Sequence, residues 1–285
     1  MKDQGQHRVS KTYLKQFGFR DRNQKWVISV LELGNPITKH MSIKSFTRET
    51  NLFDLELFEG ETLRTFEDNC SKIETHYPKL ISSIQQEAHL NDKYVEFLIH
   101  FLPSLLCRNI PFRHWVEQLT TLKETRLKFF NEITMFMDDE VEKKLLTTLK
   151  SNLDIKYQVN FVMFYVMQFL FKVLSGCTFV LLQADEDRAW FTTDNPVVFD
   201  RQNNYEWTIP PESEFYLPLN PEFCVFAYNP KVDSHNKLRR LTHQSITKLD
   251  AKTHKMVADK IAYNQIKYLI SPLDLGKIDL REKAT

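Results

Sequence analysis

Two short runs near the start of the chain have the composition and length that are typical of β-strands. The runs are Trp26 to Leu33 and Ile37 to Ile43, and the Gly34-Asn35-Pro36 sequence between them is a turn signal. The pattern therefore predicts a β-hairpin. Before this hairpin, Ser10 is a suitable N-cap for a short helix that contains Tyr13.

Apolar positions recur with helical spacing from about Glu61 onward. The expected helices cover residues 61–88, 91–108, 112–136, 138–150 and 154–175. Suitable helix caps occur at Asn91-Asp92 and Asp138-Asp139, and Pro111 marks a break between two helices. Pro103 falls inside the second helix, where we expect it to cause a kink.

Strand patterns return in the last third of the chain. The expected strands are Thr178–Gln183, Ala189–Thr193, Phe215–Leu219 and Phe223–Tyr228. A final helix over about residues 245–266 leads into a short strand at Lys267–Ile270.

This order of elements predicts an α+β fold, in which a helical middle lobe packs on a mainly antiparallel sheet. A hairpin of this size is too small to be stable alone, so we expect the N-terminal hairpin and the C-terminal strands to form that sheet together. The chain would then be a single intertwined domain over residues 1–285. Its parts are the N-terminal motif and hairpin (1–45), the helical region (61–175) and the strand-rich region with the final helix (178–271).

Composition narrows the classes of function. Phe occurs 22 times and Gly only 6 times, so we expect an aromatic core and few glycine-dependent turns. The sequence contains neither GxGxxG nor GxxxxGK[ST], which argues against Rossmann dinucleotide binding and Walker-type ATPase activity. The net charge of +1 supplies no overall basic field for nucleic acid. We interpret the local basic patch at Lys237, Arg239 and Arg240 as a solvated loop.

The spacing of the cysteines and the short length of the best membrane-span candidate favour a cytoplasmic protein. The cysteines form no CxxC pair, so neither a zinc site nor a disulfide framework is expected from Cys70, Cys107, Cys177 and Cys224. The N-terminus lacks the apolar core of a signal peptide. The best membrane candidate, Phe161 to Leu174, is shorter than a span requires, so we interpret it as a buried core helix and expect no membrane partner.

Short elements spread over almost the whole chain resemble one family. The opening, His7 to Phe17, is similar to the start of the bacterial family called domain of unknown function 4238, which has a histidine, Val-Pro, a Tyr-Leu pair and a Phe. Ser10 replaces that proline, and Asn109-Ile110 replaces Thr-Pro in a later element. The resemblance implies no established activity. The other matching elements, in order, are Glu67 with Ser71 to Glu74, Arg108 to Arg113, Thr193 to Val197, Leu217 to Pro221 and Asn264.

Polar residues of these elements supply the candidate chemistry. Glu67 and Glu74 are seven positions apart, about two helical turns, so both can face one side of a helix. A histidine, carboxylates and arginines suit phosphodiester cleavage, with His or Glu as general acid or base and Arg stabilising charge on the phosphate. The candidate catalytic residues are His7, Glu74, Arg108 and Asp194, and the candidate substrate-binding residues are Arg113, Asn195 and Tyr13.

Two variants of this chemistry stay open. The first is a metal site, because the sequence offers oxygen and imidazole ligands for Mg²⁺ or Mn²⁺ in Glu67, Glu74, Asp194 and His7. Their spacing is not diagnostic of any metal, so the cofactor is unknown.

The second variant is a metal-free ribonuclease. Arg108-Asn109-x4-His114 resembles the Arg-Asn-x4-His signature of the HEPN ribonucleases, which act on RNA without metal. Here Pro111 interrupts the helix that this signature needs.

Two classes of function follow, and the substrate, partner and oligomeric state stay open for both. The first is an enzyme acting on RNA, DNA or another phosphate ester, in a defence or toxin-like role, whose catalytic candidates converge in an open cleft with a positive rim. The second is a non-catalytic binding or regulatory module, in which the same residues form a structural ion-pair network and Asp194 caps a turn before Pro196. The second predicts that alanine at Glu74 or Arg108 lowers stability by several kcal/mol.

Overall fold

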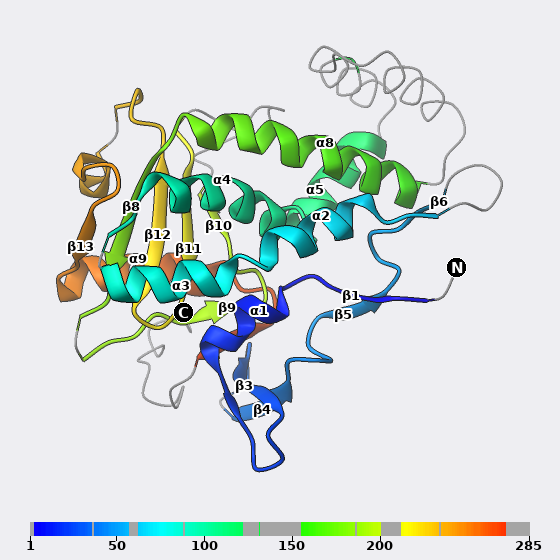
Figure 1. Cartoon of the computed structure of the whole chain (residues 1–285), viewed down its shortest axis with the longest axis horizontal. Coiled ribbons are helices and arrows are strands. Elements are labelled where there is room, and N and C mark those ends of the chain that lie inside the picture. Colours follow the sequence, from blue (N-terminus) through cyan, green and yellow to red (C-terminus); the bar gives the residue numbers. More distant parts are fainter. Residues whose placement is uncertain are drawn as a thin grey trace.

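A computed structural model describes residues 3–35, 37–56, 62–87, 89–121, 131, 155–185, 187–200, 212–233 and 235–271. Figure 1 shows a layer of several helices over the central strands and an N-terminal hairpin that extends away from this layer. The described α-helices are α1 (Lys11–Leu14), α2 (Thr65–Glu74), α3 (Tyr77–Glu87), α4 (Asp92–Leu106), α5 (Ile110–Thr121), α8 (Ile155–Ser175) and α9 (Ala251–Tyr263). Short 3-10 helices occupy Lys15–Phe17 and Lys237–Arg240.

One five-stranded sheet forms the centre of the fold. Its order is β10-β11-β12-β8-β13, and every neighbouring pair is antiparallel except β13 with β8. The strands are β8 (Thr178–Gln183), β10 (Val198–Asp200), β11 (Glu214–Pro218), β12 (Phe223–Tyr228) and β13 (Ile246–Lys248).

Both faces of this sheet are buried, which explains why its strands are continuous apolar runs. In β12, alternate residues Phe223, Val225 and Ala227 join a core with the helices α2, α3, α4, α5 and α8. The residues between them, including Cys224 and Phe226, join a second core with α9. The period-two alternation of side chains along a strand divides the two cores.

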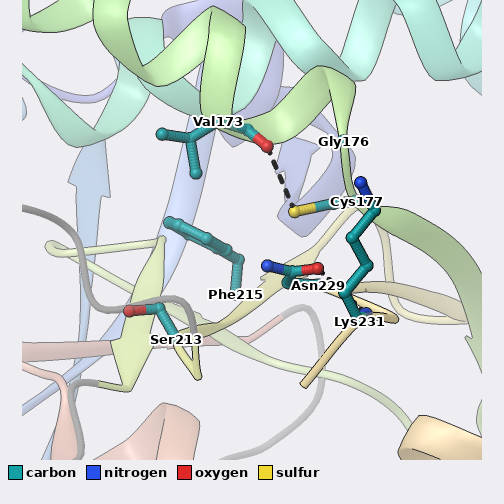
Figure 2. A pocket seen from close by; sticks show the side chains of 7 residues that line it. All are labelled: Val173, Gly176, Cys177, Ser213, Phe215, Asn229 and Lys231. Carbon is teal, nitrogen blue, oxygen red and sulfur yellow. Dashed lines mark hydrogen bonds between the residues drawn. The ribbon is translucent and has the colours of Figure 1, made fainter.

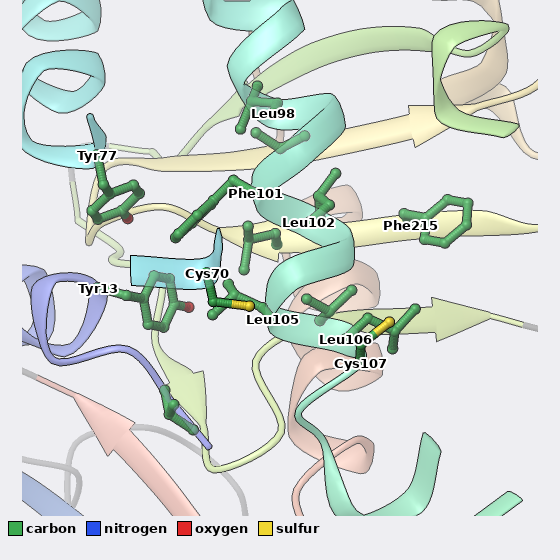
Figure 3. Packing of buried hydrophobic residues seen from close by; sticks show 14 of the residues in the cluster. Tyr13, Cys70, Tyr77, Leu98, Phe101, Leu102, Leu105, Leu106, Cys107 and Phe215 are labelled. Carbon is green, nitrogen blue, oxygen red and sulfur yellow. The ribbon is translucent and has the colours of Figure 1, made fainter. Parts of the chain in front are cut away.

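Aromatic side chains fill much of the first core, as the high phenylalanine content predicts. The ring of Phe101 on α4 stacks on Tyr77 at 4.7 Å and on Phe97 at 5.1 Å, measured between centroids. Tyr13 of α1 packs against the same group (Figure 3). The α1 segment therefore anchors the N-terminal region to the helical layer.

The N-terminal hairpin belongs to a separate five-stranded sheet. This sheet has the path β2-β3-β14-β9, with β4 added on β3. Its strands are β2 (Gly18–Arg20), β3 (Trp26–Glu32), β4 (Thr38–Ser42), β9 (Thr192–Thr193) and β14 (Tyr268–Ser271). The α+β class with antiparallel sheets is thus confirmed, whereas the expectation of one shared sheet is wrong. Among the described C-terminal strands, β14 pairs with β3 of the hairpin and β9 pairs with β14, whereas β8, β10, β11, β12 and β13 form their own sheet.

Three predicted boundaries change for local reasons. The expected 61–88 helix is two helices, because Pro78 in the first turn of α3 cannot continue a helix from α2. The expected 245–266 helix begins later, at Asp250, whose side chain caps α9 by accepting the amide of Thr253 at 2.7 Å. Only Thr192–Thr193 of the expected 189–193 strand pairs in a sheet.

Other sequence predictions hold or lie outside the described residues. Ser10 caps α1 and Asn91 caps α4, as predicted. Pro103 lies inside α4, and the kink expected there stays a prediction. The expected 138–150 helix lies outside the described residues, as do most of the residues from 122 to 136. Within the part of the chain that the structure describes, no helix is long and apolar enough to cross a membrane.

The basic patch at residues 237–240 is a 3-10 helix in which Lys237 and Arg240 are exposed, as predicted, but Arg239 is not. Arg239 is buried and pairs with the buried carboxylate of Glu214 at 2.9 Å. The same carboxylate accepts a hydrogen bond from the Tyr216 hydroxyl at 2.8 Å and bonds from Asn236. Arg239 therefore stabilises the edge of the central sheet.

Two additional strand pairs frame the N-terminal segment. The strand β1 (Gly5–His7) is antiparallel to β5 (Arg48–Thr50), and β6 (Leu55–Glu56) is antiparallel to β7 (Thr62–Leu63). Because β1 leads directly into α1, the β1–β5 pair fixes the residues around His7 against the helices.

Candidate functional site

Arg108 lies at the centre of a buried polar cluster, directly after the C-terminal end of α4. Its side chain is 2% exposed. Nη2 donates to Glu74 Oε1 at 2.5 Å, and Nη1 donates to the backbone carbonyl of His7 at 3.1 Å. Burial acts to lower the pKa of Arg108, but the neighbouring Cys70, Glu74 and Glu67 raise it overall, so this arginine stays charged.

Hydrogen bonds of His7 and Gln6 hold the N-terminal segment beside Arg108. The His7 ring hydrogen-bonds the Lys44 carbonyl through Nε2 at 2.9 Å. The carboxamide of Gln6 is fully buried, donates to Asp54 and accepts the amide of Phe53 at 2.6 Å. Burial lowers the pKa of His7. The ring is therefore neutral at pH 7 and donates its Nε2 proton to Lys44.

Glu67 and Glu74 lie on one side of α2, as the sequence predicts, and both lie near Arg108. The two carboxylates are not equivalent. Glu74 is 17% exposed at its side chain and accepts the Arg108 hydrogen bond. Glu67 Oε2 is buried and has no hydrogen-bond partner among the described residues. Burial raises the pKa of Glu67 to about 7, against the opposing charge of Arg108.

Arg108 also keeps one buried donor unused. Its Nε has no hydrogen-bond partner among the described residues, although Glu67 lies within electrostatic reach. Buried polar atoms without partners are rare in folded proteins, and each needs an explanation such as a ligand, an ion or a chemical role. The cluster therefore contains both a donor and an acceptor that no other described group satisfies.

Cysteine side chains line the same cluster. Cys70 on α2 and Cys107 after α4 are both fully buried, and Figure 3 shows them beside the apolar residues of α4. Burial raises the pKa of Cys70 to about 11. Both thiols are therefore protonated at neutral pH, which removes the thiolate that nucleophilic catalysis would need. All four cysteines are free, in agreement with the absence of a disulfide framework.

Arg113 occupies a separate position on α5. Its guanidinium lies over the ring of Phe53, 5.1 Å from the centroid, and Nη2 donates to Asn160 Oδ1 at 2.5 Å. Nη1 is buried without a partner among the described residues, and so are both side-chain polar atoms of Asn109. Burial, helped by the charge of Arg8, lowers the pKa of Arg113 to about 10.

Asp194 does not bond to the Arg108 cluster in the part of the chain that the structure describes. Its carboxylate accepts the backbone amides of Ile266 and Lys267 at the start of β14, with distances of 3.0 Å for Ile266 and 3.0 and 3.3 Å for Lys267. Burial raises the pKa of Asp194, and these amide hydrogen bonds oppose that change. The geometry is that of a residue that fixes a turn.

Asn195 forms a reciprocal clasp with Asn264 at the end of α9. Asn195 Nδ2 donates to the Asn264 carbonyl at 3.0 Å, and Asn264 Nδ2 donates back to the Asn195 carbonyl at 2.6 Å. The hydroxyl of Tyr13 is equally enclosed, since it contacts Thr192 Oγ1 at 2.6 Å and donates to the Pro218 carbonyl at 2.8 Å. Asn195 and Tyr13 were predicted to bind substrate. In the structure, each of them joins distant segments of the chain.

The two variant chemistries find little support in this geometry. Among the described residues, no three side chains of His, Cys, Asp or Glu are grouped so as to hold a metal ion. His114 is 65% exposed, whereas Arg108 is buried and bound to Glu74. The Arg-Asn-x4-His residues therefore do not present one common face.

A small pocket lies apart from these residues. It has a volume of about 130 Å³ and lies between the end of α8 and the adjoining ends of β11 and β12, where Cys177, Ser213, Phe215 and Lys231 line it (Figure 2). The Cys177 thiol hydrogen-bonds the Val173 carbonyl at 3.5 Å, and burial raises its pKa to about 12. None of the residues predicted to form the site lines this pocket.

The fold is α+β, and Glu67, Glu74 and the backbone of His7 lie around one buried arginine, Arg108. The chain belongs to the family described as protein of unknown function DUF4238, whose sequence pattern matches residues 5–267. Comparison with the curated proteins gave no match, and neither did comparison with the solved structures. The elements that suggested this family therefore supply Glu74 and Arg108, the ion pair at the centre of the cluster.

Sequence reasoning missed several members of the site. Glu67 was not among the residues predicted to be catalytic. Asn109 was considered only as a departure from the family pattern and in the Arg-Asn-x4-His signature, and Gln6, Asp54 and Asn160 were not considered at all. The signal for Gln6 and Asp54 was weak because the two residues lie 48 positions apart. A buried polar pair at that separation is visible only after β1 and β5 are paired.

Proposed function

We propose that this protein acts on a phosphate ester, with a nuclease-like or phosphatase-like reaction at the cluster of Glu67, Glu74 and Arg108. One observation carries the proposal. Glu67 Oε2 and Arg108 Nε are buried in the same cluster, each without a partner among the described residues, and the pKa of Glu67 is about 7. Strongly perturbed groups of this kind concentrate at functional sites.

The chemistry assigns different roles from those predicted by the sequence alone. A carboxyl group with a pKa near the working pH exchanges a proton efficiently, so Glu67 would act as the general acid or base. In its ionised form it would accept the proton of the attacking water or hydroxyl. Arg108 would stabilise the negative charge that develops on the phosphate oxygens. His7 is less suitable than Glu67, because its Nε2 is bound to Lys44.

Glu74 and the His7 carbonyl would act as positioning groups. Each accepts a hydrogen bond from one terminal nitrogen of Arg108, and the buried Nε of Arg108 has no partner among the described residues. Glu74 is also the member of the cluster that reaches the surface, since its side chain is 17% exposed. A substrate phosphate would therefore approach from the side of Glu74.

The test is turnover of defined substrates by the full chain. Labelled RNA, labelled DNA, bis-p-nitrophenyl phosphate and p-nitrophenyl phosphate are each incubated with and without Mg²⁺ or Mn²⁺. The proposal predicts cleavage of at least one substrate, reduced about 10²-fold or more by Glu67→Gln, as expected for loss of a general acid or base. The control is Glu96→Gln, which changes an exposed carboxylate of α4. Equal rates for wild type and Glu67→Gln would refute it.

A second candidate is a non-catalytic binding or regulatory module. It is favoured by the nearly complete enclosure of Arg108 and by the use of the Asp194 carboxylate to bind backbone amides. In this case the Arg108 cluster holds the N-terminal segment in place, and no phosphate ester is turned over. Binding of labelled RNA and DNA without turnover, or co-purification of a stoichiometric protein partner, would favour the module over the enzyme.

A further inference from the structure

The start of α5 has an unusual set of unused polar groups. Asn109 is the N-cap residue, because its carbonyl accepts the amide of Arg113 at 2.9 Å. An N-cap asparagine normally uses its side-chain oxygen to accept an amide of the first helical turn. Here Asn109 is 2% exposed, and neither its Oδ1 nor its Nδ2 has a partner among the described residues. The positive end of the helix dipole is therefore not capped by that side chain.

Arg113 belongs to the first turn of α5, and neutral groups hold its side chain. Asn160 accepts a hydrogen bond from Nη2 and is itself anchored to the carbonyls of Leu52 at 3.1 Å and Asp54 at 2.9 Å. The Phe53 ring supports one face of the guanidinium. Glu117 lies only within electrostatic reach, and the buried Nη1 has no hydrogen-bond partner among the described residues. This nitrogen is therefore a charged donor that is free to bind an anion.

Arg8 brings a second positive charge close to the first. It follows β1, its backbone amide donates to the Thr47 carbonyl at 3.2 Å, and its side chain pairs with Glu49. The charge of Arg8 is felt at Arg113, where it opposes ionisation. Arg8 is 22% exposed, so it lies on the solvent side of the two arginines. Glu49 compensates the charge of Arg8 in part, whereas Arg113 Nη1 has no hydrogen-bonded acceptor among the described residues.

We infer that Arg113, Asn109 and Arg8 form a binding site for an oxyanion of the phosphate class at the N-terminus of α5. A tetrahedral phosphate offers several acceptor oxygens, so it can accept hydrogen bonds from Arg113 Nη1 and Asn109 Nδ2 and from the first-turn amides of Ile110 and Phe112, since Pro111 has no N–H. Asn109 Oδ1 then accepts the proton of a singly protonated phosphate or an adjacent hydroxyl. This site does not depend on the acid–base role proposed for Glu67.

The test is a binding measurement that does not depend on catalysis. Inorganic phosphate, a 5′-mononucleotide and a short oligonucleotide are titrated into the full chain by calorimetry at constant ionic strength, with thermal unfolding as a second readout. Loss of a hydrogen bond to a charged group costs about 1.5–3 kcal/mol, which corresponds to roughly ten- to hundredfold in affinity. We expect Arg113→Gln to weaken phosphate binding by that factor.

The matched control is Arg240→Gln, which removes an exposed arginine of the 237–240 turn and leaves affinity unchanged. If Arg113→Gln does not fold, the same phosphate titration is made with Arg8→Gln. Arg8 is on the solvent side, and we expect its loss to lower the affinity for phosphate severalfold. Tighter binding of the nucleotide than of phosphate, lost in the same variants, identifies a nucleotide as the source of the phosphate. Absence of saturable binding to the wild type, or equal affinity in Arg113→Gln or Arg8→Gln, would overturn the inference.

Discussion

Arg108 binds the carboxylate of Glu74 at 2.5 Å across 34 positions of sequence, and its other terminal nitrogen binds the backbone of His7. This geometry joins α2, the end of α4 and the N-terminal segment through one side chain. An arginine suits this place because its planar group offers donors in several directions and remains charged when buried.

The first prediction concerns the cost of breaking this pair. Arg108→Ala leaves Glu74 without its partner and the His7 carbonyl without its donor, so we expect a loss of about 3–5 kcal/mol in the free energy of unfolding. Urea denaturation measures this loss. The double variant Arg108→Met with Glu74→Leu should recover part of it, because replacing a buried ion pair by apolar groups is often neutral. A loss below about 1 kcal/mol for Arg108→Ala would show that the pair is not structural.

A second prediction uses the pKa of Glu67. The folded protein retains this proton up to about pH 7, whereas an unperturbed glutamate has a pKa of 4.5. The contribution of Glu67 to the free energy of unfolding is therefore fully present below about pH 4.5 and is lost as the pH rises toward 7. The full difference is roughly 3 kcal/mol.

Glu67→Gln should remove this dependence. We expect the difference in unfolding free energy between the variant and the wild type to shift in favour of the variant as the pH rises from about 5 to 8. Chemical denaturation at several pH values measures it, with Glu96→Gln as the matched control. A difference that is constant with pH would mean that Glu67 has an ordinary pKa.

The third prediction concerns the clasp at the end of α9. Asn264 Nδ2 donates to the carbonyls of Asn195 at 2.6 Å and Val197 at 2.8 Å. Asn264→Ala leaves both carbonyls without this donor, so we expect a loss of about 1–3 kcal/mol in thermal or urea unfolding. The exposed Asn23→Ala serves as control and should change stability by less than about 0.5 kcal/mol. Equal stability of the two variants would contradict the proposed role of the clasp.

Much of the fold could be predicted from local patterns. The strands Thr178–Gln183 and Phe223–Tyr228 have the predicted bounds, because both faces of the central sheet are buried and produce continuous apolar runs. Ser10 and Asn91 also act as the predicted caps. These features depend on neighbouring residues, so they are visible in the sequence.

The features that were predicted wrongly depend on contacts between residues that are far apart in the sequence. The division into two sheets follows from β14 pairing with β3 across more than two hundred positions, which no local pattern specifies. The same limit applies to the site. The approach of Glu74 to Arg108 was expected from the family elements, but Asp194 was expected beside them, and it caps the start of β14 instead. Its side-chain chemistry alone does not distinguish a catalytic carboxylate from a structural cap.

The measurement that tests the central claim most directly is the pH dependence of kcat/KM for phosphate-ester hydrolysis by the wild type and by Glu67→Gln. We predict a wild-type profile with an inflection near pH 7, the pKa of Glu67, and a rate reduced about 10²-fold or more in the variant. Glu96→Gln should reproduce the wild-type profile. No turnover by a folded wild type between about pH 5 and 9, or the same profile in Glu67→Gln, would contradict the claim that Glu67 acts on a phosphate ester.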